Sequence, residues 1–334
     1  MESLKPYHTF AVDVSADRIV RLETERDCAG FLRLDGPRAL LGSGSDVLFS
    51  SDFRGTVGRV ILKGLEISSD DSWHRIRVSA GEIWHDLVER LTVEEGIAGL
   101  ENLALIPGTC GAAPVQNIGA YGCEFAEFCE YVEAVNAQGE TVRISQNECG
   151  FGYRSSNFKT KWKDLLVITA IGLKISRAWQ PRLDYGQLKE LKNESAPAAE
   201  DVMRRVMEIR RSKIPDPSQL PNAGSFFKNP LVSPGAYHAL RSRYSSMPAY
   251  PQADGKYKLS AGWLIDMAGM KGYRLGDAGV YENHALILVN HGGARPEDLL
   301  QTALDVIDAV ESRFGIRLQP EVRIYGETGE IAIR

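Results

Sequence analysis

The chain has 334 residues, which is more than one hydrophobic core usually organises, so we expect two or three domains. Its apolar content of 43% and charged content of 25% are typical of a soluble globular protein, and its net charge of -5 argues against nucleic-acid binding. The most apolar run, residues 165–173, is too short to span a membrane, and no apolar leader follows the first methionine. We therefore expect a cytoplasmic protein with neither a membrane nor a nucleic-acid partner.

Cysteine and histidine are sparse and scattered. The five cysteines include no Cys-x-x-Cys pair, and the six histidines include no His-x-x-x-His pair. Zinc sites usually need such spacings. The sequence therefore predicts reduced thiols and no metal site.

Hydrophobic periodicity predicts short strands and helices punctuated by glycine and proline. In the first third of the chain, apolar runs predict strands at 38–41, 47–49 and 75–80. A helix is expected to begin after Gly81 and to end near Gly96.

The middle of the chain is predicted to hold a hairpin, a strand and a helix. The hairpin pairs 131–135 with 141–144, and the strand at 165–175 is so continuously apolar that we expect burial on both faces. The helix at 198–211 is followed by two prolines near residue 216, which favour a domain boundary. The last third is predicted to contain a helix at 261–267, a strand at 285–289, a long helix at 296–314 and a strand at 321–325.

A first glycine-rich loop, residues 42–46 (Gly-Ser-Gly-Ser-Asp), follows an apolar strand. Its backbone N–H groups could cradle a phosphate, and a plain tight turn is the alternative interpretation. A Rossmann fingerprint is excluded because Val47 replaces the third glycine and strand-like residues follow. The P-loop sequence Gly-x-x-x-x-Gly-Lys-Ser/Thr is absent from the chain.

A second loop, residues 107–122, contains four glycines and three alanines. The side chains of this loop are too small to build a hydrophobic core, but they allow the backbone to approach a flat ligand closely. Gln116 and Asn117 could hydrogen-bond a heterocycle edge. Long irregular loops tend to be functional, so we predict a ligand contact here.

Three polar residues are candidates for chemistry. Ser225 lies between a glycine and two phenylalanines, where backbone can approach a ligand and water can be excluded, but no Gly-x-Ser-x-Gly elbow surrounds it. Arg154 follows Gly-Tyr and could bind a carboxylate with its planar fork, although a surface ion pair is the commoner role of a lone arginine. Glu321 begins the last predicted strand, and a strand-edge charge is the alternative for it.

Together these motifs resemble the UDP-N-acetylenolpyruvoylglucosamine reductases, the flavoenzymes that make UDP-N-acetylmuramate for bacterial peptidoglycan. The resemblance covers nearly the whole chain. The segment 183–186 (Leu-Asp-Tyr-Gly) is similar to the longer, type I branch, in which a mobile tyrosine covers the substrate. Four blocks in the same order carry the resemblance most specifically: residues 106–122, 152–156, 224–230 and 320–323.

The resemblance implies an α+β fold in three parts. Residues 1–63 with 314–334, and residues 64–214, would form two FAD-binding parts of the vanillyl-alcohol-oxidase (PCMH) type. Residues 215–313 would form a C-terminal α+β substrate-binding domain. The glycine loops then fail the Rossmann pattern because they belong to a different flavin fold.

The implied reaction is the NADPH-dependent reduction of UDP-N-acetyl-3-O-(1-carboxyvinyl)-glucosamine to UDP-N-acetylmuramate through bound FAD. By similarity, Ser225 would protonate the carbanion or enol left by hydride transfer, and Arg154 and Glu321 would stabilise that species. We expect a monomer whose partners are small molecules, namely FAD, NADPH and the sugar nucleotide.

The resemblance also assigns binding residues. Asp46 stands where many relatives have asparagine, so its carboxylate is expected either to point away from a pyrophosphate or to bind elsewhere on the cofactor. The expected FAD contacts are Gly42, Ser43, Gly44, Ser45, Pro107, Gly108, Gly111, Ala112, Asn117, Gly119, Ala120, Tyr121 and Arg210. The expected contacts to the sugar nucleotide or to NADPH are Tyr185, Lys213, Lys228, Asn229, Tyr250 and His284.

Two other functions are consistent with parts of the sequence. A flavin-dependent oxidase could share the fold, and oxygen consumption without a sugar nucleotide would reveal it. A non-catalytic nucleotide-binding protein is disfavoured because a degenerate copy should have lost Ser225, Arg154 or Glu321. Taken alone, Tyr185 and His284 would be interpreted as packing residues.

Overall fold

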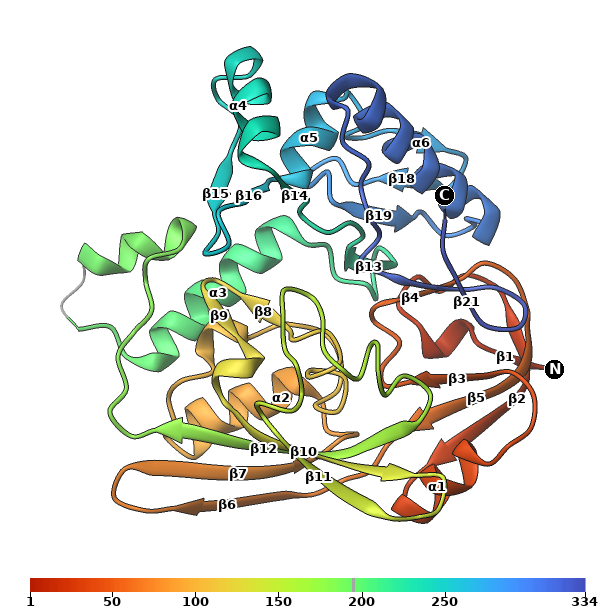
Figure 1. The fold of residues 1–334 in the computed structure, drawn as a ribbon, viewed down its shortest axis with the longest axis vertical. Helices are drawn as coiled ribbons and strands as arrows, with labels where there is room; N and C mark the ends of the chain where they lie inside the picture. The colour runs from red at the N-terminus through yellow and green to blue at the C-terminus, as the bar shows by residue number, and fades with distance from the viewer. Residues whose placement is uncertain (194–195, 334) are drawn as a thin grey trace. The chain divides into compact units, whose positions relative to one another are not determined.

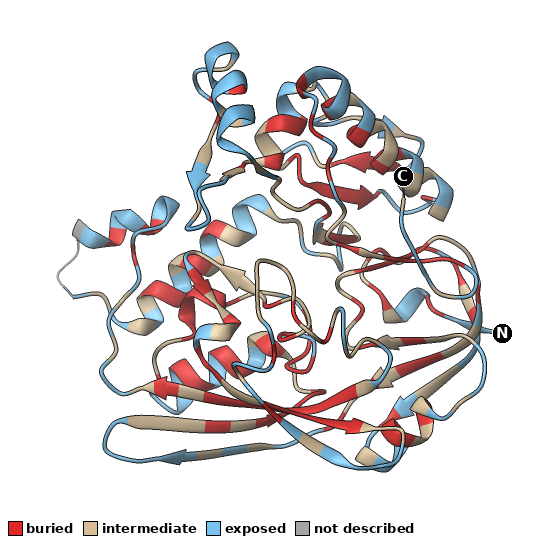
Figure 2. Ribbon diagram, viewed as in Figure 1, coloured by how far each residue is buried: buried red, intermediate tan, exposed pale blue. Residues whose placement is uncertain are grey.

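The computed structural model describes residues 1–193 and 196–333 of the chain, and it mixes helices with antiparallel and parallel strands (Figure 1). This confirms the expected α+β class. Buried residues gather along the inner strands of the sheets and on one side of each long helix, whereas several edge strands are largely exposed (Figure 2). In the described part of the chain, no helix is long and apolar enough to cross a membrane.

The chain divides into two compact units, each built from segments that are far apart in the sequence. Two strands, β2 (Ser15–Leu22) and β5 (Phe53–Val60), begin in one unit and continue into the other. The division into three parts stays a prediction. Unit 1 consists of Met1–Asp17, Ser45–Arg54 and Lys213–Arg334, and unit 2 consists of Arg18–Gly44 and Gly55–Ser212.

A five-stranded antiparallel sheet organises unit 2, in the order β11-β10-β12-β7-β6. The central strand β12 is buried along most of its length, as its continuous apolar run predicts. The hairpin of β10 and β11 is also confirmed. The five strands are β6 (Leu65–Ser69), β7 (Trp73–Ser79), β10 (Cys129–Asn136), β11 (Thr141–Ser145) and β12 (Leu166–Ser176).

Helices and short strands complete unit 2. Helix α1 (Glu25–Leu32) contacts β10 and β12, and strand β3 (Arg38–Leu41) pairs in parallel with the part of β5 that belongs to this unit. Helix α3 ends at Lys213, the first residue of the C-terminal segment of unit 1. The other elements are α2 (Trp84–Glu89), the π-helical turn η2 (Arg90–Glu94), η3 (Glu101–Leu103), β8 (Gly119–Ala120), β9 (Cys123–Glu124), η4 (Phe125–Glu127), η5 (Gly186–Asn193) and α3 (Ala199–Lys213).

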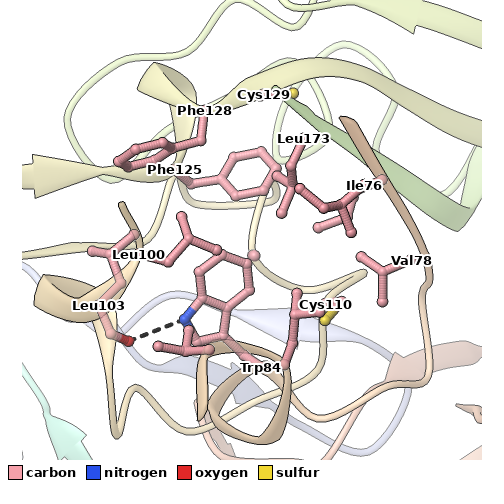
Figure 3. Close-up of a cluster of buried hydrophobic side chains, with 14 of the residues drawn as sticks. Ile76, Val78, Trp84, Leu100, Leu103, Cys110, Phe125, Phe128, Cys129 and Leu173 are labelled. Atoms are coloured by element: carbon pink, nitrogen blue, oxygen red, sulfur yellow. Dashed lines mark hydrogen bonds between the residues drawn. The ribbon is translucent and has the colours of Figure 1, made fainter. Parts of the chain in front are cut away.

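Trp84 anchors the core of unit 2 beneath the second glycine-rich loop. It is 1% exposed, and its indole N–H donates to the carbonyl oxygen of Leu103 at 3.0 Å (Figure 3). Its ring meets Phe125 nearly edge-on, with 6.0 Å between the ring centroids. A buried indole needs such a hydrogen-bond partner, so Trp84 fixes the start of α2 against the segment that leads into the loop.

A second sheet, β13-β19-β18-β17, organises the C-terminal part of unit 1, and helices α5 and α6 pack together beside it. Helix α6 begins at Pro296 and ends before Gly315, as predicted, because proline suits a first turn and Gly315 adopts the left-handed cap. Its apolar stripe is buried except for Leu300, which is half-buried. These elements are β13 (Asn222–Ser225), α5 (Ala261–Met267), β17 (Arg274–Leu275), β18 (Ala278–Val280), β19 (Ile287–Asn290) and α6 (Pro296–Phe314).

Two small sheets and the N-terminal segment complete unit 1. Strand β4 from the first third of the chain pairs in parallel with β20 near the C-terminus. A further sheet has three strands in the order β14-β16-β15, and helix α4 lies between β14 and β15 in the sequence. The elements are β1 (Glu2–Ser3), η1 (Lys5–Tyr7), β4 (Val47–Phe49), β14 (Leu231–Val232), α4 (Pro234–Arg243), β15 (Ala249–Pro251), β16 (Tyr257–Leu259), β20 (Arg323–Tyr325) and β21 (Glu330–Ile331).

Two strand predictions differ from the structure at their first residues. The strand expected at 285–289 begins only at Ile287, because its N–H bonds back to the carbonyl of His284 in a turn. The strand expected at 321–325 begins at Arg323, because the Glu321 N–H is taken by the Phe226 carbonyl instead of a ladder partner. Both shifts lie beside candidate site residues.

Candidate functional site

The two glycine-rich loops meet inside unit 2. A Cβ atom on Gly42 would lie 2.4 Å from the Thr109 Oγ1, and a Cβ on Gly111 would lie 2.5 Å from the Cβ of Ala80. Glycine is therefore required at both positions by the close approach of other chain segments. Sequence motifs identified both loops but not their contact through Thr109, because a threonine inside a loop gives no local signal of a distant partner.

Backbone hydrogen bonds fasten the second loop to the segment between β7 and α2. Cys110 donates to the Glu82 carbonyl at 2.8 Å, and Gly111 donates to the Ala80 carbonyl at 2.9 Å. Trp84 in turn donates to the Gly108 carbonyl at 3.0 Å. The loop is thus irregular but held in place, which is the condition for a pre-formed binding surface.

Asn117 holds the second loop with its side chain. It is 1% exposed, its Oδ1 accepts from the Ala126 N–H at 2.9 Å, and its Nδ2 donates to Glu124 Oε2 at 2.8 Å and to the Gly152 carbonyl at 3.3 Å. The amide is therefore engaged within the protein. A contact of Asn117 with a cofactor stays a prediction.

Two arginines and a tyrosine gather beside this loop in unit 2. Arg154 adopts a left-handed backbone with φ +52°, and its Nη2 donates to the Gly119 carbonyl at 3.0 Å. Arg210 lies on α3, and burial lowers its pKa, an effect opposed by Tyr121 and reinforced by the charge of Arg154. Within the described residues, the buried Nε of Arg210 has no hydrogen-bond partner.

This arrangement suits an anion. A buried guanidinium N–H without a partner is costly, and two neighbouring cations repel each other, so a phosphate or carboxylate would relieve both effects. Glycine loops, an aromatic ring and a cationic pair together fit the phosphates and rings of a flavin dinucleotide. The residues of unit 2 that would hold the flavin dinucleotide are Gly42, Gly108, Gly111, Gly119, Tyr121 and Arg210.

Tyr185 lies next to Tyr121 in unit 2. The two rings meet at 88° with 5.9 Å between centroids, and Tyr185 is 49% exposed. Asn102, which is 1% exposed, donates from its Nδ2 to the carbonyls of Tyr121 at 2.9 Å and of Arg182 at 3.0 Å. Asn102 thereby ties the segment that carries Tyr185 to the glycine loop, a role that no sequence motif indicates.

The serine loop, residues 224–230, lies beside residues 319–321, which lead into strand β20 of unit 1. Glu321 donates its N–H to the Phe226 carbonyl at 2.7 Å, and Lys228 donates its N–H to the Gln319 carbonyl at 2.9 Å. Ser225 is exposed, whereas the following residue, Phe226, is fully buried. The structure therefore brings the Ser225 and Glu321 segments together, which no sequence motif could establish.

His284 and Lys213 form a second polar pair in unit 1. Burial lowers the pKa of His284, and the positive charges of Lys213 and Lys271 lower it further. The Leu286 N–H donates to the His284 Nδ1 at 3.3 Å, so the neutral ring keeps its proton on Nε2. His284 can therefore offer one N–H donor beside a cation, which suits a phosphate oxygen.

The other expected ligand contacts of unit 1 differ in their surroundings. Asn229 caps α5, because its Oδ1 accepts from the Ala261 N–H at 2.9 Å. Tyr250 is 46% exposed on β15, and Lys228 is half-buried. In the first loop, Asp46 accepts the Arg323 N–H at 3.1 Å with its main-chain carbonyl.

No group of three or more metal-binding side chains occurs among the described residues, and all five cysteines are buried thiols. The catalytic and binding roles of the single residues stay predictions. What the structure adds is their grouping within each unit.

Family models match both units. Residues 16–145 match the FAD binding domain, which includes both glycine loops. Residues 216–325 match the C-terminal domain of UDP-N-acetylenolpyruvoylglucosamine reductase, which includes Ser225 and Glu321.

Whole-chain comparisons agree with these matches. The chain is 46% identical to the UDP-N-acetylenolpyruvoylglucosamine reductases of Shewanella sp. (strain ANA-3), over 99% of this chain and 98% of that protein, and of Escherichia coli (strain K12), over 99% and 97%. The crystal structure of the reductase (MurB) from Thermus caldophilus is similar with a TM-score of 0.65 and 26% identity, covering 97% of both chains. The protein is accordingly an FAD-dependent oxidoreductase, and it belongs to the UDP-N-acetylenolpyruvoylglucosamine reductase family.

Proposed function

We propose that the protein reduces UDP-N-acetyl-3-O-(1-carboxyvinyl)-glucosamine to UDP-N-acetylmuramate with NADPH, in the cytoplasm, as a step of peptidoglycan precursor synthesis. The observation that carries the proposal is the pairing of the Ser225 loop with the Glu321 strand, in a chain that also presents the Arg154 and Arg210 cations. Members of the family bear the name of this reaction.

The chemistry adds a hydride and a proton across the enol-ether double bond of the substrate. Bound FAD would supply the hydride, having received it from NADPH. After hydride addition the substrate carries negative charge that spreads onto its carboxylate. Arg154 supplies a fixed positive charge for that carboxylate, and Ser225 gives its hydroxyl proton to the neighbouring carbon. Glu321 completes the stabilisation of the charged species.

The remaining polar residues are proposed to hold the nucleotides. Lys213, Lys228 and the Nε2–H of His284 suit phosphate oxygens, because each provides a donor and two of them provide charge. Tyr185 and Tyr250 are exposed aromatic rings that can cover a sugar or a base. NADPH and the sugar nucleotide are proposed to use these contacts in turn.

The absorbance spectrum of the purified protein tests this function. We expect a yellow protein whose flavin absorbance is bleached by NADPH without oxygen and returns when the enolpyruvyl sugar nucleotide is added. A colourless protein that cannot be reconstituted with FAD would contradict the proposal. Rapid oxygen consumption without the sugar nucleotide would favour an oxidase instead.

Ser225→Ala tests the proton donor. Removing a general acid typically slows its step by about 10²–10⁴-fold, so reoxidation of the flavin by substrate should slow by that factor while reduction by NADPH stays normal. Stopped-flow absorbance measures the two half-reactions separately. Ser242→Ala, an exposed serine on α4, is the matched control and should leave both rates unchanged.

A further inference from the structure

Strand β13 carries one extra residue against its partner β19. Asn222 lies opposite Val289 and Ser225 lies opposite Ile287, so three steps along β13 match two steps along β19. Gly224, directly before Ser225, has φ +69°. This is the arrangement of a β-bulge whose first residue is a left-handed glycine, and such bulges re-aim the side chain that follows. The bulge therefore decides where the Ser225 hydroxyl points.

The side chain of Asn222 holds this bulge. Its Oδ1 accepts the Gly224 N–H at 2.9 Å, while its Nδ2 donates to the carbonyls of Pro215 at 3.0 Å and of Leu220 at 2.8 Å. Its own backbone N–H donates to the Thr9 carbonyl at 3.0 Å. The residue is fully buried, so water does not compete for these bonds.

The chain is also fixed on the other side of Ser225. Phe226 donates its N–H to the Leu286 carbonyl at 2.8 Å, and its carbonyl accepts the Glu321 N–H. Both hydrogen bonds join backbone atoms only, and the side chain of Phe226 is fully buried. Asn222 thus holds the chain segment directly before Ser225 with a polar side chain.

We propose that Asn222 is a positioning residue for Ser225. Through the Gly224 amide it holds the bulge that aims the hydroxyl, and it touches neither substrate nor cofactor itself. This inference rests on the proposed function, in which Ser225 donates the proton. Only an amide supplies both the acceptor for Gly224 and the two donors for the carbonyls of Pro215 and Leu220.

Asn222→Asp is the sharpest test, because it keeps the volume and replaces the two donors by an oxygen that faces carbonyl oxygens. A misplacement of about 1 Å can slow a reaction on the order of 10²-fold. We therefore expect flavin reoxidation by the enolpyruvyl sugar nucleotide to slow by that factor, with a larger rate difference between H₂O and D₂O. Flavin content and flavin reduction by NADPH should stay within about twofold of the unaltered protein's values, because they do not use the Ser225 proton.

Asn290→Asp is the matched control in the same unit. Asn290 is 1% exposed, its Nδ2 donates to the Phe10 carbonyl at 2.9 Å, and its Oδ1 accepts from Gly292 at 2.8 Å and Ala294 at 3.0 Å. Its side chain is also a buried amide bonded to backbone groups, but it holds residues 292–294 and not the bulge. Its backbone N–H donates to the Pro221 carbonyl at 2.9 Å, a bond that the substitution leaves in place. We expect a comparable loss of thermal stability without the slow reoxidation, and equal slowing in both variants would overturn the proposal.

The double variant Asn222→Asp/Ser225→Ala separates positioning from general damage. If Asn222 acts through Ser225, the double variant reoxidises no more slowly than Ser225→Ala alone; additive slowing would overturn the proposal. Should Asn222→Asp fail to fold, Gly224→Ala tests the same bulge. Alanine disfavours the left-handed backbone at φ +69°, and a Cβ there meets no atom within 4 Å, so the strain comes from the backbone alone and the same comparison applies. Normal reoxidation in Ser225→Ala would contradict the proton-donor role of Ser225 and with it the role of Asn222, whereas a slow Ser225→Ala with a normal Asn222→Asp would overturn only the role of Asn222.

Discussion

Burial affects the protonation of individual side chains in this protein as much as their partners do. His8 is 4% exposed, with its ring 5.7 Å from that of Phe49. Burial lowers the pKa of His8 to about 4. The folded protein therefore holds this ring neutral over a pH range in which an unfolded chain would protonate it.

Acid should destabilise the fold through His8. The unfolded pKa is near 6.5 and the folded pKa is about 4, so the unfolded state binds the extra proton and the free energy of unfolding falls as pH drops between these values. The loss reaches about 3 kcal/mol, at 1.36 kcal/mol per pKa unit. Thermal unfolding of His8→Asn between pH 7.5 and about 4.5 should show a flatter decline than the unaltered protein, and an identical decline would refute this account.

The charge of Lys213 should be visible in the titration of His284. Because Lys213 and burial both lower the pKa of His284, Lys213→Met is expected to raise that pKa toward its usual value. NMR titration of the His284 ring measures the shift. Lys256→Met, which removes an ammonium that pairs with Asp254 at 3.1 Å, is the control and should leave the His284 pKa unchanged.

Sequence motifs identified residues of the site but not the partners that hold them. Ser225, Arg154 and Glu321 stand in distinctive local patterns. Thr109 and Asn222 do not, because their roles depend on contacts with chain segments that are distant in sequence or on a bulge set by a partner strand. Local pattern therefore predicts candidate reacting groups, whose roles stay predictions, and only the folded chain shows which side chains hold the segments that carry them.

At the scale of elements, prediction succeeded where the start and end signals were local. Helix α6 has a proline in its first turn, a regular apolar stripe and a glycine directly after its last residue. Helix α1 was missed although Thr24 and Asp27 form a capping box, because it spans only 8 residues and contains a glycine, so it gives little periodic signal. Strand β19 was placed two residues early because its apolar run begins within a turn, which the Ile287 N–H closes on the His284 carbonyl.

The end of α6 should be sensitive to its glycine. Gly315 has φ +67°, and a Cβ there meets no atom within 4 Å, so alanine would suffer only the backbone penalty of about 1–2 kcal/mol. Gly235 lies inside α4 with open space around it and no left-handed backbone, so Gly235→Ala should instead stabilise by up to about 1 kcal/mol. Urea unfolding of the two variants measures both effects, and equal shifts in the same direction would contradict the explanation.

At the scale of the whole molecule, unit 1 depends on segments from both ends of the chain. Strand β4 is buried and pairs with β20 over Val47 to Phe49. The family model for the FAD domain reaches residue 145, but strand β4 within that range has its partner near residue 324. In the structure the last strand lies in the same unit as residues 1–17, and the three-part division stays a prediction.

A chain that stops after Gln319 should lose the order of unit 1. It lacks β20 and the Phe226–Glu321 hydrogen bond, so β4 and the serine loop both lose a partner. A chain that stops after Glu327 keeps β20 and its pairing with β4, and it loses the exposed strand β21 with the Arg323–Glu330 ion pair. Limited proteolysis should cut the shorter chain near residue 225 much faster than the longer one, and equal cutting rates would show that β20 is dispensable.

The pairing of β4 with β20 also matters while the protein is being made. Strand β4 is synthesised long before its partner β20, because residues 50–322 separate the two strands in the chain. During that interval Val47, Leu48 and Phe49, which are at most 6% exposed in the finished fold, have no edge to join. An apolar strand left open during synthesis is a template for association with other nascent chains, so the yield of this enzyme in a cell should depend on chaperones that shield strand β4 until β20 has been synthesised.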